Sequence, residues 1–175
     1  MITIIVGTNR NDSISRLIAE QYADMLLQKF QQPTQLLDLQ ELPVDFISTA
    51  LYEHTGKNEA FNAVSALIAG SEKFVFVLPE YNGSFPGVLK AFIDGLAYPN
   101  TFRHKKAAML AISNGTQGGL LAMSHLTDIF NYLGMHVLAN KVRIPQVHNH
   151  MAEGKIITPF YLELMELQAE QFLSF

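Results

Sequence analysis

Three polar segments of this 175-residue chain carry the side chains that could do chemistry. The first, residues 7–15, reads GTNRNDSIS and combines three hydroxyl groups with one guanidinium. Hydroxyls, an arginine and the free N–H groups of a following helix are donors that hold a phosphate. The patterns GxxxxGK[ST] and GxGxxG are absent, so we expect a monophosphate. The alternative is that Ser13 or Ser15 is only a helix N-cap and Arg10 only a solvated side chain.

The second and third polar segments each follow an apolar run. PEYNGS, residues 79–84, comes directly after Phe74–Leu78, and SNGTQGG, residues 113–119, follows a run that begins at Ala107. A plain turn needs only Asn82 and Gly83, so the aromatic Tyr81 beside them indicates a further role. The third segment taken alone indicates only a turn, because glycine-rich turns are common in α/β proteins.

Other candidate sites are weaker than these three segments. His148, His150 and Glu153 could bind a metal, but they match no ligand motif, so we expect a solvated loop and no metal site. Ser113 could suggest a hydrolase, yet the nucleophile pattern GxSxG is missing.

Alternating strands and helices must position these segments. Short apolar runs predict strands at residues 2–6, 34–39, 73–78, 107–113 and 136–138. Apolar residues at helical spacing predict helices that begin after Ser13, end near Gly70, begin near Pro86, end at Gly134 and begin after Ile157. The stretches 40–56 and 139–157 have no clear period, and we expect both to be irregular.

This alternation predicts an α/β fold, a three-layer α/β/α sandwich around a five-stranded parallel sheet of order 2-1-3-4-5. We expect one domain over residues 1–175, because a typical domain takes roughly 100 to 200 residues. Ligands of such sheets bind beyond the carboxyl ends of the strands, where the strand order reverses. The polar segments follow the first, third and fourth strands, so we expect all three on one rim.

Composition excludes several classes of function. The chain is 49% hydrophobic, has a net charge of −4 and contains no cysteine, which argues against disorder, nucleic-acid binding and thiol chemistry. Any redox chemistry must therefore use a bound cofactor. No apolar stretch approaches the ~18 residues that span a bilayer, and the N-terminus lacks the pattern of a signal peptide. We expect a cytoplasmic protein that binds neither membrane nor nucleic acid.

The segment GTNRNDSIS and residues 79–96, PEYNGSFPGVLKAFIDGL, resemble the two motifs of the NADPH-dependent FMN reductase family. This flavodoxin-like family includes quinone, chromate and azo-dye reductases. Its usual first motif is G-S-x-R-x-x-S-x-N, so Thr8 replaces a serine and Ser15 stands where asparagine is common. The resemblance implies that the FMN phosphate is held by Thr8, Arg10, Ser13 and Ser15, that the isoalloxazine ring is lined by Pro79, Glu80, Tyr81, Asn82 and Gly83, and that its other edge is approached by Ser113 and Gly115.

The resemblance also implies a reaction and an assembly. Hydride would pass from NADPH or NADH through bound FMN to a small acceptor such as a quinone, an azo compound, a metal oxyanion or free flavin. No side chain is expected to act as a catalytic acid or base, and a capping or ring-edge contact suits Glu80 better than a general-base role. Similar proteins are homodimers or homotetramers, with Phe85, Val88 and Phe92 as candidate contacts to the partner.

Two other classes of function fit the same pattern. A flavodoxin-type electron carrier would bind FMN without its own NAD(P)H activity, although such carriers are usually far more acidic than this chain. A flavin-free binding or scaffold domain would keep the fold and bind no cofactor.

Overall fold

The computed structural model describes residues 1–175. The strands are β1 (Ile2–Val6), β2 (Gln35–Asp38), β3 (Lys73–Pro79), β4 (Lys106–Ile112), β5 (His136–Val137), β6 (Val142–Ile144), β7 (Met151–Ala152) and β8 (Lys155–Ile156). The α-helices are α1 (Ile14–Phe30), α2 (Phe46–Thr49), α3 (Glu59–Ala69), α4 (Gly87–Gly95), α5 (Leu120–Tyr132) and α6 (Pro159–Ser174). Three short 3-10 helices are η1 (Leu39–Glu41), η2 (Tyr52–His54) and η3 (Val147–His150).

The main sheet has the predicted parallel order β2-β1-β3-β4-β5, which confirms the flavodoxin-like fold. A sixth strand, β6, shares the last position with β5. The first part of β4, at Lys106 and Ala107, pairs with β5, whereas its last part, Leu110 to Ile112, pairs with β6. The chain after β5 therefore returns to the carboxyl edge of the sheet.

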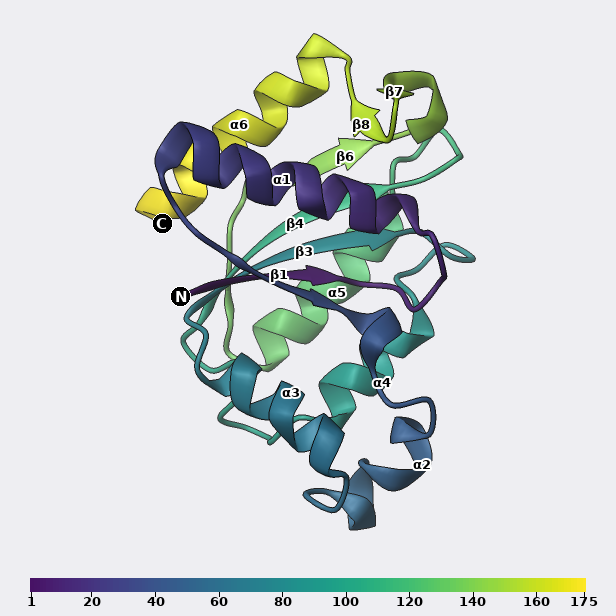
Figure 1. Cartoon of the computed structure of the whole chain (residues 1–175), viewed down its shortest axis with the longest axis vertical. Helices are drawn as coiled ribbons and strands as arrows, with labels where there is room; N and C mark the ends of the chain where they lie inside the picture. The colour runs from purple at the N-terminus through teal and green to yellow at the C-terminus, as the bar shows by residue number, and fades with distance from the viewer.

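Helices cover both faces of the sheet. α1 and α6 lie on one side, and α3, α4 and α5 lie on the other (Figure 1). In β1, Ile4 and Val6 pack into the core under α1 and α6, whereas Ile5 packs into the opposite core. Successive residues of a strand point to opposite faces, so a strand covered on both sides is mostly apolar on both. This explains the apolar runs in the sequence, and the buried Thr3 hydroxyl of β1 is satisfied by Ser71 at 2.6 Å.

A buried amide ties α1 and α6 to the sheet. Gln168 Nε2 donates hydrogen bonds to the carbonyl oxygens of Met109 and Asn140 at 2.9 and 2.8 Å, and its Oε1 accepts one from the Tyr22 hydroxyl at 3.3 Å. Burial raises the pKa of the Tyr22 phenol well above its ordinary value. Because these buried polar groups satisfy one another, α1 is held at a fixed place on the sheet.

The two stretches expected to be irregular contain short elements, so that prediction was wrong. Residues 139–157 form β6, η3 and the antiparallel β7–β8 hairpin, and residues 40–56 contain η1, α2 and η2. Each of these elements has two to four residues, which is too short for a sequence period to appear. None of the helices has the length and the apolar character needed to cross a bilayer.

One of the three expected subunit contacts is also wrong. Phe92 lies on the buried face of α4, fully inside the core, where its ring and that of Phe61 form an edge-to-face pair with a centroid distance of 6.2 Å. It cannot reach a partner without unfolding the core. Phe85 and Val88 are only partly buried against the same core.

Candidate functional site

The three polar segments converge, as predicted, on one cavity of about 400 Å³ at the carboxyl edge of the sheet. The backbone N–H of Gly7 donates to Val77 O at 2.8 Å, and that of Glu80 donates to Ile112 O at 3.0 Å, so the loops start side by side. Seven predicted site residues line the cavity: Arg10, Ser13, Ser15, Pro79, Glu80, Tyr81 and Ser113. The other four, Thr8, Asn82, Gly83 and Gly115, do not line it.

The first loop presents a helix N-terminus and one guanidinium to the cavity. Ser13 caps α1, because its Oγ accepts a hydrogen bond from Arg16 N at 3.2 Å. The remaining free N–H groups of the first turn and the positive end of the helix dipole favour an anion beside Ser13 and Ser15. Arg10 is exposed and lines the same cavity, so its charge is available to a ligand.

The nearby Arg16, by contrast, is committed to protein carboxylates. Its guanidinium contacts Glu20 Oε1 at 2.9 Å and both Asp38 Oδ2 and Glu41 Oε1 at 3.1 Å. These three acceptors raise the pKa of Arg16 above its ordinary value, Glu20 contributing most. Three surrounding acids offset its charge, which leaves Arg10 as the arginine that can bind an anion in the cavity.

Thr8 does not line the cavity but contacts the second loop. Its side chain is buried, its Oγ1 lies 3.0 Å from the Tyr81 hydroxyl, and it also accepts a hydrogen bond from Arg10 N at 3.3 Å. The Thr8–Tyr81 bond joins loops that are 73 residues apart in the chain. It therefore fixes the Tyr81 ring at the cavity wall.

The second loop is a tight two-residue turn. Tyr81 and Ser84 exchange two backbone hydrogen bonds, of 2.8 and 3.0 Å, and the residues between them, Asn82 and Gly83, have φ of 51° and 74°. Two successive positive φ values are typical of a type I′ turn, which asparagine and glycine adopt with little strain. This confirms the turn that the sequence predicts and places Tyr81 at its first position.

Glu80 contains an unsatisfied polar atom. Its Oε2 is the one buried side-chain oxygen or nitrogen of the chain that has no hydrogen-bond partner. An unsatisfied buried acceptor costs free energy, and in native proteins such an atom often marks a functional position. A ligand that brings an N–H or O–H donor to this part of the cavity would remove the deficit.

The third loop is closed by its own hydrogen bonds. The Ser113 hydroxyl donates to Gly115 O at 2.9 Å and accepts from Gly118 N at 3.1 Å. Gly119 has φ of 77°, and a Cβ there would lie 2.5 Å from the Cβ of Ala111. Packing against β4 therefore explains this glycine, whereas a Cβ at Gly115 would meet no protein atom.

A fourth wall of the cavity was not predicted from the sequence. Val147 and His148 line it, because Val147 N donates to Ser113 O at 3.0 Å and Gln146 N donates to Gly115 O at 3.0 Å. No sequence pattern links this segment to the third loop, since β6 alone brings it there. His150 points elsewhere, bonding Thr158 Oγ1 through Nδ1 at 3.0 Å. The structure contains no group of three or more metal-ligating side chains.

Comparison with known proteins identifies the family. Residues 1–149 match the family model for NADPH-dependent FMN reductases. The chain belongs to the NADPH-dependent FMN reductase family. It is accordingly an NAD(P)H-dependent oxidoreductase whose cofactor is FMN, as the sequence resemblance implied.

The relatives of this chain include proteins named as quinone reductases and as FMN reductases. The chain is 30% identical to a 2-hydroxy-1,4-benzoquinone reductase of a Burkholderia species, over 90% of this chain and 85% of the relative. It is 26% identical to an NAD(P)H-dependent FMN reductase of Schizosaccharomyces pombe, over 89% of this chain and 78% of the relative. The solved structure of an NADH:FMN oxidoreductase has a TM-score of 0.81 at 20% identity and covers 99% of this chain and 88% of its own, which shows the shared fold.

The cavity residues of this reductase fit FMN. Arg10 and the capped N-terminus of α1 suit a phosphate, and Tyr81 supplies an aromatic surface beside it. The unpaired Glu80 oxygen requires a hydrogen-bond donor, which a flavin has in its ribityl hydroxyls and its imide N–H. The cavity thus combines a cationic group and an aromatic ring, which match the phosphate and the ring of a flavin mononucleotide.

Proposed function

We propose that this reductase passes hydride from NADPH or NADH, through FMN bound in the cavity, to a small acceptor of the quinone or azo class. The observation that carries the proposal is the convergence of the phosphate-type first loop and the aromatic second loop on one cavity. The names of two relatives, a benzoquinone reductase of Burkholderia and an NADPH azoreductase of Bacillus, support the acceptor class. The bound flavin supplies the hydride chemistry.

The protein groups would bind and orient, and none would transfer a proton. We assign the phosphate to Arg10, Ser13 and Ser15, with Thr8 acting through its bond to Tyr81. We assign the ring to the turn that begins at Tyr81 and to the backbone around Gly115. The hydroxyl of Ser113 is already bonded within its own loop, so backbone groups of the third loop would make the contacts there.

The ring contacts rest on the resemblance together with the cavity lining. Pro79 and Glu80 line the cavity, whereas Asn82 and Gly83 form the tip of the turn. We propose that the tip sets the path of the backbone and that Glu80 accepts a hydrogen bond from the flavin. Residues 1–175 would act as one FMN-binding domain, because both buried cores pack against a single sheet. The cytoplasmic location expected from the sequence stays a prediction.

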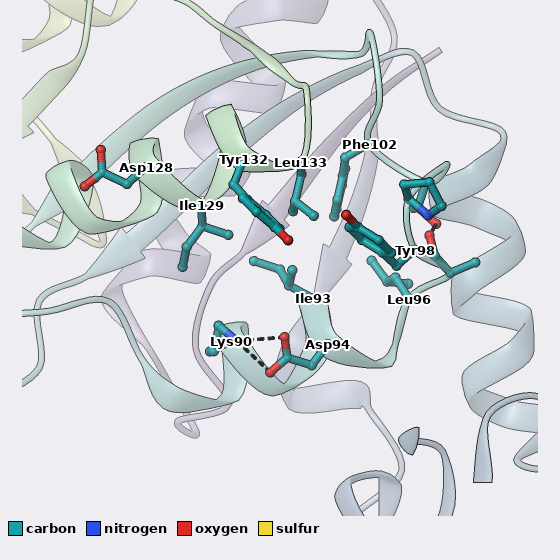
Figure 2. Close-up of a pocket in the computed structure, with 13 residues that line it drawn as sticks. Lys90, Ile93, Asp94, Leu96, Tyr98, Phe102, Asp128, Ile129, Tyr132 and Leu133 are labelled. Carbon is teal, nitrogen blue, oxygen red and sulfur yellow. Dashed lines mark hydrogen bonds and ion pairs between the residues drawn. The ribbon is translucent and has the colours of Figure 1, made fainter. Parts of the chain in front are cut away.

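We further infer that the enzyme works as a homodimer or as a homotetramer built from such dimers. A cavity of about 570 Å³ with mostly apolar walls lies between α4, the segment after it and α5. Figure 2 shows Tyr98 and Tyr132 with nearly parallel rings across this cavity, and their residues are 67% and 77% exposed. Neighbouring exposed aromatic rings over an apolar cavity are typical of a surface that a partner covers. α4 follows the Tyr81 turn directly, so this surface is connected to the cofactor site.

The visible spectrum of the purified protein, followed by anaerobic addition of NADPH, tests the proposed function. A yellow protein whose colour bleaches on addition supports the reductase. Yellow that persists in the presence of NADPH supports an electron carrier instead. A colourless protein that takes up no added FMN would leave only a flavin-free role and would contradict the proposal.

A further inference from the structure

The Tyr81 turn has a polar contact with α5 that the reaction does not use. Ser84, the last residue of the turn, has its Oγ 3.0 Å from Nδ1 of His125. His125 lies in the second turn of α5 and does not line the cofactor cavity. Since α5 begins at Leu120, directly after the third loop, this hydrogen bond links the second loop to the helix that anchors the third.

An apolar side chain of the same helix, that of Leu121, lies near the tip of the turn. A Cβ placed on Gly83 would lie 3.8 Å from Leu121 Cδ1, an ordinary packing distance. At the other end of the turn, the Tyr81 hydroxyl is held by Thr8. The turn is therefore fixed from two sides, by the first loop at Tyr81 and by α5 at Ser84.

We propose that His125 is a positioning residue, which sets the spacing between the Tyr81 turn and the third loop and thereby the width of the slot for the flavin ring. The inference rests on the proposed function, in which these two loops contact opposite edges of one flat ring. A support outside the cavity is needed because loops hold a ligand well only when neighbouring groups fix their position, and the solvent-exposed Ser84–His125 hydrogen bond joins the turn to α5. Backbone bonds fix the turn internally, whereas the His125–Ser84 bond fixes the turn relative to α5.

The chemistry of the pair suggests two matched substitutions. A serine hydroxyl both donates and accepts, so it bonds a ring nitrogen in either role. The asparagine side chain places its amide near the position of the histidine Nδ1, whereas the longer glutamine places its amide near Nε2. His125→Asn should therefore keep the bond to Ser84, and His125→Gln should lose it while retaining a polar side chain on α5.

The test uses the full-length chain as His125→Asn, His125→Gln and Ser84→Ala, with Ser124→Ala as a control at an exposed position of the same helix. Hydrogen exchange of the Tyr81 and Ser84 amides is measured before flavin is added. The FMN dissociation constant and the visible circular dichroism of the bound flavin are then measured. Loss of one such bond should weaken FMN binding by about 3- to 10-fold in His125→Gln and Ser84→Ala.

In the same two variants we expect faster exchange of both amides and an altered dichroism spectrum. His125→Asn and the control should match the wild type, and the double variant His125→Gln/Ser84→Ala should bind FMN no worse than either single variant. Equal effects of the asparagine and glutamine variants, or additive losses in the double variant, would overturn the proposal. If exchange responds as expected but the wild type binds no FMN, the proposed function fails while the contact itself stands.

Discussion

Arg10 carries the charge that this cavity can offer to a phosphate. The Arg16 guanidinium is occupied by Glu20, Asp38 and Glu41, and the Thr8 and Ser13 side chains are bonded within the protein. The exposed Arg10 has no such carboxylate partner. Most of the electrostatic attraction for the cofactor phosphate should therefore depend on one side chain.

Replacing Arg10 by alanine should strip FMN from the protein and leave the fold intact. A charge-assisted hydrogen bond contributes about 1.5–3 kcal/mol, so FMN affinity should fall about 10- to 100-fold. Riboflavin, which lacks the phosphate, should bind the variant and the wild type alike. Fluorescence titration with both ligands measures this, and Arg103→Ala, at an exposed arginine away from the cavity, serves as the control. Unchanged FMN affinity would show that the phosphate lies elsewhere.

We expect Glu80 to favour FMN binding, while its unpaired buried oxygen lowers the stability of the flavin-free protein. Glu80→Met replaces the carboxylate by an apolar group of similar size and removes the unpaired buried oxygen. We expect the flavin-free variant to be more stable by about 1 kcal/mol and its FMN affinity to be lower, because the acceptor for the flavin is lost. Urea unfolding of the flavin-free protein and FMN titration measure the two effects. A flavin-free variant that is less stable than the wild type would contradict this account.

The third loop shows how a structural element separates two glycines that look equivalent in sequence. Gly119 is confined by its positive φ and by Ala111 on β4, whereas Gly115 faces open space. The first is required by the packing of α5 onto the sheet. The second is free to approach a ligand, as the family resemblance implies.

Alanine substitutions at these two glycines should therefore affect different properties, namely stability at Gly119 and FMN binding at Gly115. Gly119→Ala should destabilise the protein by about 1–3 kcal/mol, because it combines backbone strain with a clash. Gly115→Ala should change the free energy of unfolding by less than about 0.5 kcal/mol but weaken FMN binding, since its methyl group would lie where the family resemblance places the edge of the flavin ring. Thermal unfolding and FMN titration of both variants provide the measurement. A stable Gly119→Ala protein would mean that the loop can move away from β4.

As a whole, the molecule also has a recess with mostly apolar walls outside the cofactor site. It lies between α4 and α5, where the neighbouring Tyr132 raises the pKa of Tyr98 above its ordinary value. The recess and the cofactor cavity are both bordered by the chain from Tyr81 to the end of α4. Covering the recess by a second copy would bury both tyrosine rings and brace that chain.

Introducing a charge into this recess should separate the subunits of the proposed homodimer. Tyr132→Glu places an unpaired carboxylate at an exposed position, so the monomer should fold normally while association weakens by about 2 kcal/mol or more. Sedimentation velocity over a range of protein concentrations measures the change. Tyr52→Glu, at another exposed tyrosine that does not line the recess, should leave the oligomeric state unchanged. A wild-type chain that is monomeric at all concentrations would contradict the homo-oligomer.

The sequence alone predicted the parallel sheet and the turn at Asn82 and Gly83. These features follow from local patterns, namely apolar runs, helical spacing and turn residues, which act over a few neighbouring positions. The strand order and the shared rim of the three loops are not local features, and they were expected because the alternation and the family motifs indicate a flavodoxin-like fold. The family motifs lie in the same loops and are equally local.

Only the tertiary structure decided which polar groups are free. Thr8 is bonded to Tyr81, Arg16 to Asp38 and Ser84 to His125, pairs that lie 22 to 73 residues apart in the chain. β6 brings Val147 and His148 to the cavity from a stretch with no period of its own. Hydrogen bonds and charges are short-ranged in space but not in sequence, so a residue type can indicate a capability, while its neighbours in the fold determine whether that capability is used.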